Sequence, residues 1–344
     1  MSPDPATGLG SSGGTPSAEV PPLEVRGLVK RYGDLTAVGG VDITVNAGDV
    51  YGYLGPNGAG KTTSLRMMLG LIRPTEGSVR LFGRDPLGSI AALQGVAGFV
   101  EAPTFYPYLS ARKNLEMLAA FDGGGAGGRI DQALETVELT SRAGDRVGGY
   151  SHGMRQRLGI AAALLRDPKL LLLDEPATGL DPAGMRDMRL LIRRLAGQGM
   201  TVLLSSHLLT EVEDVCNRVA IVRSGRIVYE GEIATLKRGA GTSYRLETTD
   251  DERALAVCRA QPGITDPRTD QHGFITFVAD EAAVGELSQA LVEAGALITA
   301  LAPQTVTLED LFFSFTEGDG DGASAARKPG SPPQEPAHAA ETAG

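Results

Sequence analysis

The feature that most constrains the fold of this chain is a glycine-rich loop between a strand pattern, Val50–Leu54, and a helix pattern that begins near Lys61. The loop and the first helical residues fit the pattern G-x-x-x-x-G-K-[ST] in full. Its glycines let successive backbone N–H groups turn inward onto a chain of phosphates, and the helix N-terminus adds its dipole to the same anion. This order of strand, loop and helix predicts a P-loop nucleotide-binding domain.

The residues of this loop are the candidate nucleotide ligands. Lys61 would reach the β- and γ-phosphates, and the hydroxyl of Thr62 would bind Mg²⁺. The complete predicted cradle is Gly55, Pro56, Asn57, Gly58, Ala59, Gly60, Lys61, Thr62 and Thr63. We therefore expect ATP and Mg²⁺ as cofactors.

A run of apolar residues that ends in two carboxylates supplies the second half of the predicted site. Leu170–Leu173 is apolar at every position, which is typical of a central parallel strand with helices on both faces. This strand would bring Asp174 near Thr62, where it can hold the magnesium shell, and Glu175 would orient and deprotonate the attacking water. The run alone also fits a core strand that ends in an acidic turn, but together with the phosphate loop it predicts ATP hydrolysis.

A third motif begins at Tyr150 and reads YSHGMRQR. It resembles L-S-G-G-Q, the signature of ABC-transporter ATPases, which is followed by a helix. Ser151 and Gly153 match the serine and the second glycine, whereas Tyr150, His152 and Met154 depart from the commonest form. A serine and a small glycine at a helix start form an anion site, although such a start is common in other proteins too. The order and spacing of the motifs favour the signature.

The resemblance implies a dimer. One ATP does not need two γ-phosphate sites, so Ser151 and Gly153 of one chain would cap the nucleotide held by another. The partner would be a second copy, or a related ATPase subunit, in a head-to-tail pair that is two-fold and self-closing.

Three further residues match the ABC family in order. Tyr32 matches the aromatic residue that stacks on adenine, and Asp181 lies in Gly179–Pro182, which matches a short dimer-contact loop. His207, after the strand pattern Thr201–Ser205, matches the switch histidine that reads the γ-phosphate. The resemblance covers roughly residues 23–236 and includes six motifs in the family's order.

One position departs from the family in an informative way. The family usually carries Gln after the strand pattern Gly98–Val100, where it contacts Mg²⁺ and the attacking water, but here Glu101 stands there. An ionised carboxylate accepts hydrogen bonds and cannot donate them. Glu101, with the residues Phe105–Ser110, resembles the bacitracin- and lantibiotic-resistance branch, which implies export of peptide antibiotics or other amphiphiles. A neutral exchange of Gln for Glu is the alternative.

Strand and helix patterns alternate through the cassette and predict an α/β fold. We expect a P-loop ABC ATPase with a mainly parallel sheet, an antiparallel N-terminal β part and a helical subdomain at about 102–165. The further expected strands are Val41–Val45, Lys169–Asp174 and Arg218–Val222, with Leu23–Tyr32 at the start and a hairpin turn at Ser224-Gly225. The expected helices are Lys61–Leu71, Ser110–Phe121, Ile130–Leu139, Gly153–Leu165, Pro182–Leu195 and Leu208–Cys216.

After residue 236 the pattern changes to a small α+β domain, predicted at 237–316 and closed by the amphipathic segment Thr307–Phe315. It resembles the C-terminal accessory domain of daunorubicin-type drug-exporter ATPases, which implies a role in dimer stability or permease contact; a simple core-forming stripe is the alternative. Residues 1–22 and 317–344 are rich in Gly, Ser, Pro and Ala, and we expect both to be disordered.

The composition of the chain limits which kinds of partner it can bind. The net charge of −10 argues against a nucleic-acid partner, and two cysteines in 344 residues fit a reducing cytoplasm. The strongest apolar run is far below the roughly 18–20 residues that span a bilayer. We therefore expect a peripheral protein at the cytoplasmic face of the membrane, recruited by a separate permease subunit.

Some alternatives stay open at this stage. The permease contact would lie in Ala102–Gly149, where Phe105, Tyr106 and Tyr108 could belong either to that contact or to the core. A soluble ABC-type ATPase that acts on ribosomes or DNA is the second functional hypothesis. It is disfavoured because the chain has one phosphate loop and no long heptad stretch between Lys61 and Ser151. The transported substrate is not encoded in these motifs.

Overall fold

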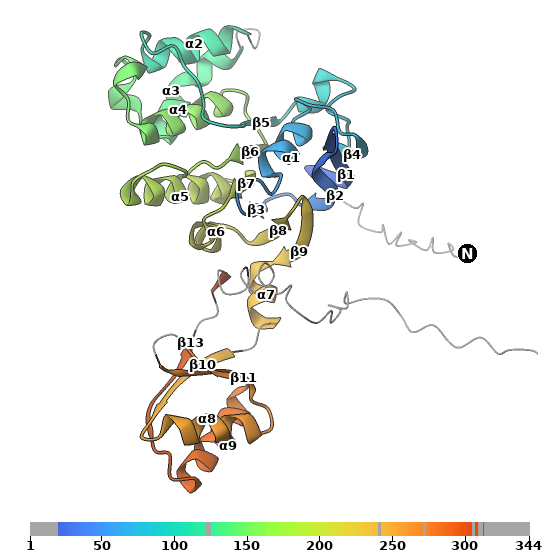
Figure 1. Ribbon diagram of the computed structural model, residues 1–344. Coiled ribbons are helices and arrows are strands. Elements are labelled where there is room, and N and C mark those ends of the chain that lie inside the picture. The colour runs from blue at the N-terminus through green and yellow to red at the C-terminus, as the bar shows by residue number, and fades with distance from the viewer. Residues whose placement is uncertain are drawn as a thin grey trace, which may run out of the picture.

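The computed structural model describes residues 20–121, 125–239, 242–270, 273–304, 307, 308 and 312. Within these ranges the chain forms a larger α/β body and a smaller one, joined by the helix α7 (Ile233–Gly239), as Figure 1 shows. The expected disordered tails, except residues 20–22, and most of the segment Thr307–Phe315 lie outside the described residues. None of the described helices is both long and apolar enough to cross a membrane.

A six-stranded sheet with the order β5-β6-β7-β3-β8-β9 forms the centre of the larger body. All of its neighbouring strands pair in parallel except β8 and β9, which form the antiparallel hairpin expected at Ser224-Gly225. Strands β3 and β6 are buried along their whole length, because helices or a second sheet cover both faces. The strands are β3 (Val50–Leu54), β5 (Val96–Phe99), β6 (Leu170–Asp174), β7 (Thr201–Ser206), β8 (Arg218–Arg223) and β9 (Arg226–Glu232).

The central sheet separates two hydrophobic cores. Successive side chains of a strand point to opposite faces, so Leu170 and Leu172 enter one core while Leu171 and Leu173 enter the other. The first core also contains Leu65 of α1 (Lys61–Met68). The second core contains side chains of α5 (Pro182–Gly197) and α6 (Leu209–Val215). The register of β6 therefore fixes which way the residues at its end point.

An antiparallel sheet with the order β2-β1-β4 covers the first core. Its strands are β1 (Leu23–Tyr32), β2 (Leu35–Val45) and β4 (Glu76–Leu81). The sheet confirms the expected antiparallel β part, but β2 is longer than predicted and β4 was not predicted. Most of β4 is exposed and only Val79 and Leu81 point inward, so its sequence carries little apolar signal. Pairing with β1 defines it.

The helices between β5 and β6 form the upper lobe in Figure 1. They are α2 (Ala111–Phe121), α3 (Ile130–Thr136) and α4 (His152–Leu164). Helix α4 begins after Ser151, whose hydroxyl accepts a hydrogen bond from the N–H of Met154 at 3.2 Å. This cap sets the first turn of the predicted signature helix.

The smaller body is an antiparallel sheet with the order β11-β12-β10-β13 and two helices. Its elements are β10 (Thr242–Thr248), α8 (Asp251–Ala260), β11 (Thr265–Thr269), β12 (Ile275–Ala279), α9 (Glu281–Glu293) and β13 (Ile298–Gln304). Phe277 and Leu246 of the sheet pack with Leu287 and Leu291 of α9. The expected α+β order is present, together with β11, which is mostly exposed and was not predicted.

Candidate nucleotide and hydrolysis site

The predicted phosphate loop connects β3 to α1 and requires glycine at two positions. Gly60 has a φ of 95°, and a Cβ there would lie 2.3 Å from the carbonyl oxygen of Ala37. At Gly55 a Cβ would lie 2.5 Å from the carbonyl oxygen of Val222. The N-cap Gly60 offers no side chain, so no side chain caps the first N–H groups of α1. This arrangement fits an anion at the helix start.

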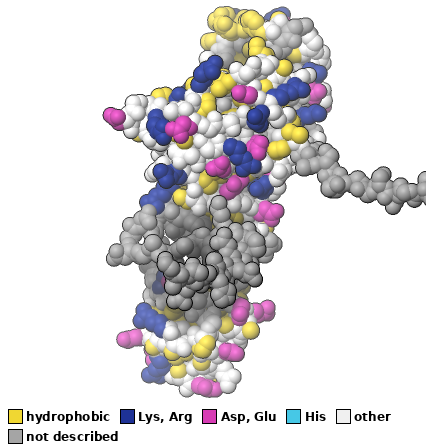
Figure 2. All heavy atoms as spheres, turned by 90° about the vertical axis from the view of Figure 1, so that its right-hand side faces the viewer, with side chains coloured by type: hydrophobic (Ala, Val, Ile, Leu, Met, Phe, Trp, Pro, Cys, Tyr) yellow, Lys and Arg dark blue, Asp and Glu magenta, His cyan; other side chains and the backbone are white. Residues whose placement is uncertain are grey.

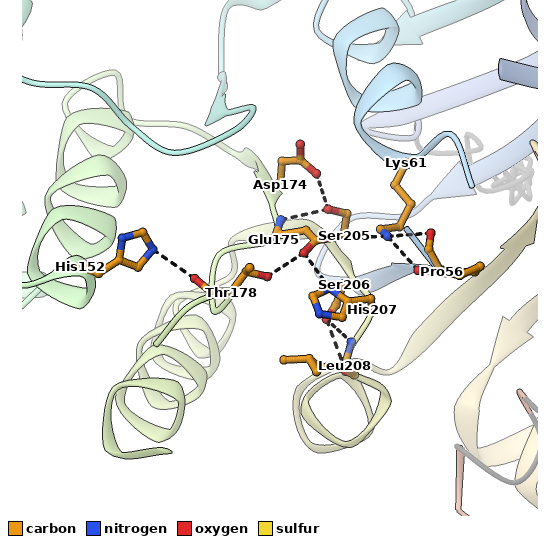
Figure 3. A network of polar contacts seen from close by, with 11 residues as sticks. Pro56, Lys61, His152, Asp174, Glu175, Thr178, Ser205, Ser206, His207 and Leu208 are labelled. Carbon is orange, nitrogen blue, oxygen red and sulfur yellow. Dashed lines mark hydrogen bonds and ion pairs between the residues drawn. The ribbon is translucent and has the colours of Figure 1, made fainter. Parts of the chain in front are cut away.

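Lys61 lies folded over the loop, with 5% of its side chain exposed. Its ammonium donates hydrogen bonds to the carbonyl oxygens of Gly55, at 2.8 Å, and Pro56, at 3.2 Å. It also forms an ion pair with Oε1 of Glu175 at 3.1 Å (Figure 3). A buried ammonium group is costly unless hydrogen bonds or an opposite charge compensate it, and here both do. The Lys61 side chain thus places a positive charge inside the loop.

Asp174 ends β6 beside the end of β7. Its Oδ1 accepts a hydrogen bond of 2.5 Å from Ser205, whose hydroxyl in turn accepts one of 3.0 Å from the N–H of Glu175. Neighbouring parallel strands bring these groups together, since Asp174 and Ser205 are register partners. Ser205 was not among the predicted site residues. Its position at the carboxyl end of the next strand was the available signal.

Glu175 is the centre of the polar network in Figure 3. Its Oε2 accepts a hydrogen bond of 2.7 Å from the hydroxyl of Thr178 and lies 2.7 Å from Nδ1 of His207, while Oε1 faces Lys61. Burial raises the pKa of this carboxyl, but Thr178 and Lys61 act more strongly in the opposite direction, so the pKa lies below its usual value. The carboxylate is therefore ionised at neutral pH.

Four predicted residues, Lys61, Asp174, Glu175 and His207, thus converge on one cluster, whereas Glu101 does not join it. The carboxylate of Glu101 contacts Arg66 of α1 at 2.5 Å, and 66% of its side chain is exposed. No hydrogen bond or ion pair among the described residues links it to Lys61, Asp174 or Glu175. In this structure Glu101 therefore pairs with Arg66, and its predicted role at the magnesium ion stays a prediction.

Residues predicted to touch the nucleotide from a second chain form a separate group. Ser151 caps α4, and Oδ1 of Asp181 accepts a hydrogen bond of 3.1 Å from the N–H of Gly184 at the start of α5. Together with Gly153 they line a hollow of about 250 Å³. Tyr32 lies at the end of β1, and 49% of it is exposed. Among the described residues, the side chain of Ser151 forms no hydrogen bond or ion pair with Lys61, Asp174 or Glu175.

A second hollow, of about 340 Å³, opens on the helical lobe between β5 and α4. Phe99, Phe105, Leu118 and Phe121 are among its lining residues, and Phe121 is 83% exposed. Figure 2 shows apolar side chains gathered at the end of the molecule that carries α2. Phe105 packs against the hydrophobic core, which was one of the two roles predicted for it, the other being contact with the permease.

Comparison with known proteins shows to which family the chain is similar. A model of the ABC transporter family matches residues 38–178. The bacitracin transport ATP-binding protein BcrA of Enterococcus faecalis is 37% identical over 300 residues, which cover 87% of this chain and 97% of that protein. The daunorubicin resistance ATP-binding protein DrrA3 of Streptomyces coeruleorubidus is 35% identical over 305 residues, which cover 86% and 96%.

The chain belongs to the ABC-transporter ATPase family. A solved ATP-binding subunit of an ABC transporter has the same fold, with a TM-score of 0.57 and 27% identity over 63% of this chain and 92% of its own. These findings confirm the predicted family, the α/β cassette fold and the ATPase class. For this ABC ATPase, the roles of single residues remain predictions that rest on the geometry above.

Sequence reasoning missed the partners of three candidate site residues in this ABC ATPase. Ser205 holds Asp174, Thr178 holds Glu175, and Arg66 holds Glu101. Thr178 lies in the turn directly after Glu175, where its N–H donates a hydrogen bond of 3.2 Å to the carbonyl oxygen of Glu175. A hydroxyl three positions after a carboxylate was the signal that could have found it.

Proposed function

We propose that this ABC ATPase is the motor subunit of an exporter of antibiotic, peptide or other amphiphilic substrates. It works as a head-to-tail dimer around two ATP molecules, bound to a separate permease at the cytoplasmic face of the membrane. The observation that carries the hydrolytic part is the cluster of Lys61, Asp174, Glu175 and His207 at the carboxyl edge of the parallel sheet. The names of the relatives, which refer to bacitracin transport, daunorubicin resistance and Nod factor export, support the direction of transport.

In the proposed reaction Lys61 moves from Glu175 to the β- and γ-phosphates of ATP. The released carboxylate of Glu175 then accepts the proton of the attacking water, and His207 contacts the γ-phosphate. Asp174 and the hydroxyl of Thr62 offer the hard oxygen donors that suit Mg²⁺, which would neutralise charge on the phosphates when bound. The buried Ser205 hydroxyl fixes the orientation of Asp174 for this task.

The hollow beside Ser151 and Gly153 supports the dimer. Within one chain, Ser151 and Gly153 face a hollow of their own, and a second chain would bring them to the nucleotide. Two identical chains related by a two-fold axis complete both sites at once and leave no open surface for further growth.

The hollow on the helical lobe supports the permease contact. Its lining includes the exposed Phe121, and the rings of Tyr106 and Tyr108 pack edge to face nearby on the same lobe with centroids 5.7 Å apart. An exposed apolar patch beside a hollow fits an apolar segment of a partner protein. We assign it to a cytoplasmic segment of the permease.

Fractionation of cells that contain the tagged full chain tests the proposal. We expect the chain to sediment with membranes and to co-purify with a polypeptide that has membrane-spanning segments. Phe121→Ser combined with Tyr108→Ser should release it to the soluble fraction, while the matched control Ile90→Ser, at an 84% exposed residue outside the lobe, should not. Sedimentation with ribosomes or DNA in place of membranes would support the soluble alternative and overturn the proposal.

A further inference from the structure

His152 of the signature segment reaches the loop that follows the predicted catalytic base. Its Nε2 lies 3.1 Å from the carbonyl oxygen of Thr178. Figure 3 shows the ring pointing toward Thr178. The ring rests against Gly179, where an added Cβ would lie 3.6 Å from Nε2. Because a carbonyl oxygen only accepts, the tautomer with the proton on Nε2 donates this hydrogen bond. Position 152 is one of the three where this segment departs from the family's commonest signature.

Thr178 is tied to Glu175 in two ways. Its hydroxyl donates a hydrogen bond of 2.7 Å to Oε2 of Glu175, and its N–H donates one of 3.2 Å to the carbonyl oxygen of Glu175. The φ of Glu175 is 47°, a conformation that a non-glycine residue adopts only when its surroundings hold it. His152 is therefore two hydrogen bonds away from the carboxylate that would accept the proton.

A second contact joins the same two segments. A Cβ added to Gly153 would lie 3.5 Å from Cδ2 of Leu180, so the first turn of α4 packs closely on the loop after Thr178. The start of the signature helix and this loop thus touch at two successive positions. A displacement of the helix start would be passed to Thr178 directly.

We propose that His152 is a positioning residue that holds Glu175 in its working geometry through Thr178. This rests on the proposed roles of Glu175 as base and of the signature as a cap on a second chain's ATP. The neighbours of His152, Ser151 and Gly153, would contact that ATP, whereas Glu175 acts on the ATP bound by its own chain. His152 therefore links the occupancy of one site to the alignment of the base in the other.

Steady-state ATP hydrolysis by the full-length chain tests this link. His152→Leu removes the donor, and we expect kcat to fall about fivefold, the factor that corresponds to one lost hydrogen bond, with KM for ATP changed less than twofold. His152→Gln keeps an N–H donor and should recover most of the activity. Glu175→Gln, measured beside them, should be almost inactive.

A double-mutant cycle separates transmission from simple packing. Thr178→Val removes the hydroxyl that holds Glu175 and should itself lower kcat. If His152 acts through Thr178, adding His152→Leu to Thr178→Val should lower kcat less than twofold further. Independent, multiplicative effects of the two substitutions would overturn the proposal, and so would an unchanged kcat in His152→Leu.

A second pair of variants keeps the test decisive if His152→Leu destabilises the fold. If His152→Leu lowers the thermal midpoint, the comparison of His152→Gln with His152→Glu decides, because the two side chains have the same length but only Gln donates. Equal kcat values for that pair would overturn the inference. Normal turnover in Glu175→Gln would instead reject the proposed base, whatever the His152 variants do, so the two failures are distinguishable.

Discussion

At the scale of single residues, the site is held in a self-paired arrangement. Lys61, which would bind phosphate, and Glu175, which would accept a proton, neutralise each other at 3.1 Å. An ion pair with so little exposure is costly to break unless another charge takes over one partner. The phosphates of ATP are such a charge, so in the proposed reaction the binding of ATP by Lys61 would release the carboxylate of Glu175.

Replacing Glu175 with Gln tests this coupling. We expect turnover to fall by about 10²- to 10⁴-fold, the usual contribution of a positioned base. ATP binding should persist and become tighter, because Lys61 no longer has to leave a carboxylate. Gel filtration with ATP should then show an accumulated dimer, and a fluorescent ATP analogue should report the affinity.

Lys61→Ala is the matched control for that variant. It removes a charge contact to the phosphates, so the ATP analogue should bind markedly more weakly. Equal affinity for ATP in Lys61→Ala and the parent chain would show that the phosphate cradle is assigned wrongly.

The pair of Arg66 and Glu101 gives a second residue-scale prediction. Both side chains are exposed enough that their ion pair contributes only about 0–1 kcal/mol to the free energy of unfolding. Arg66→Ala and Glu101→Ala should therefore unfold in denaturant at nearly the parent concentration. If Glu101 acts at the magnesium ion during turnover, only Glu101→Ala should lower ATP hydrolysis; equal rates in both variants would remove Glu101 from the site.

At the scale of elements, the connection between β3 and α1 tolerates no side chain at Gly60 without a shift of its neighbours. A side chain at Gly60 would meet both an unfavourable φ and the carbonyl group of Ala37. The loop can approach β2 at Ala37 this closely only because residue 60 has no Cβ.

Gly60→Ala should lower stability and weaken ATP binding together. The left-handed conformation costs about 1–2 kcal/mol for a residue with a Cβ, and the clash adds to it. Gly48→Ala is the control, because Gly48 has a φ of 80° but no atom within 4 Å of an added Cβ. Thermal unfolding should show a larger loss for Gly60→Ala, and only that variant should lose nucleotide affinity. Equal losses in both would reject the close-approach argument.

At the scale of the whole molecule, the C-terminal part is fastened to the cassette at α6. Glu213 of α6 pairs with Lys237 of α7 and accepts a hydrogen bond of 2.9 Å from the N–H of Leu308. Leu308 is fully buried in the core cluster that also contains Ile233 and Leu236. Helix α6 begins two residues after His207, so the fastening lies close to the proposed γ-phosphate sensor.

Deletion of residues 237–344 tests this arrangement. ATP binding should remain, because the phosphate loop and all other nucleotide motifs precede residue 208. The free energy of unfolding should fall, since loss of the Leu308 side chain alone corresponds to about 2–5 kcal/mol for a core leucine. Leu308→Ala in the full chain is the control for that part. If the truncated chain is folded but no longer binds ATP, the domain boundary at residues 236 and 237 is wrong.

Mixing two inactive chains tests the shared sites. Ser151→Arg blocks the signature and Lys61→Ala weakens the phosphate loop, so a heterodimer of the two variants has one intact composite site. We expect partial recovery of ATP hydrolysis in the mixture and none in either variant alone. Two affinity tags, one on each variant, show whether heterodimers form. If they form and ATP hydrolysis does not recover, the signature does not cap the ATP of the other chain.

Local sequence determined the parts of this protein that depend on backbone chemistry. The glycines at 55 and 60, the apolar strand that ends at Asp174 and the order of the motifs predicted the cassette fold, because each motif depends on a short segment. The motifs also singled out the four residues of the cluster, Lys61, Asp174, Glu175 and His207. Strands β4 and β11, which carry little apolar signal, were not predicted, since pairing with neighbours defines them. Only the tertiary structure decided which partners the site side chains take. Ser205 on Asp174, Arg66 on Glu101 and Thr178 between His152 and Glu175 are contacts whose geometry depends on how strands, loops and helices pack. Position along the chain made Ser205 and Thr178 candidates at most.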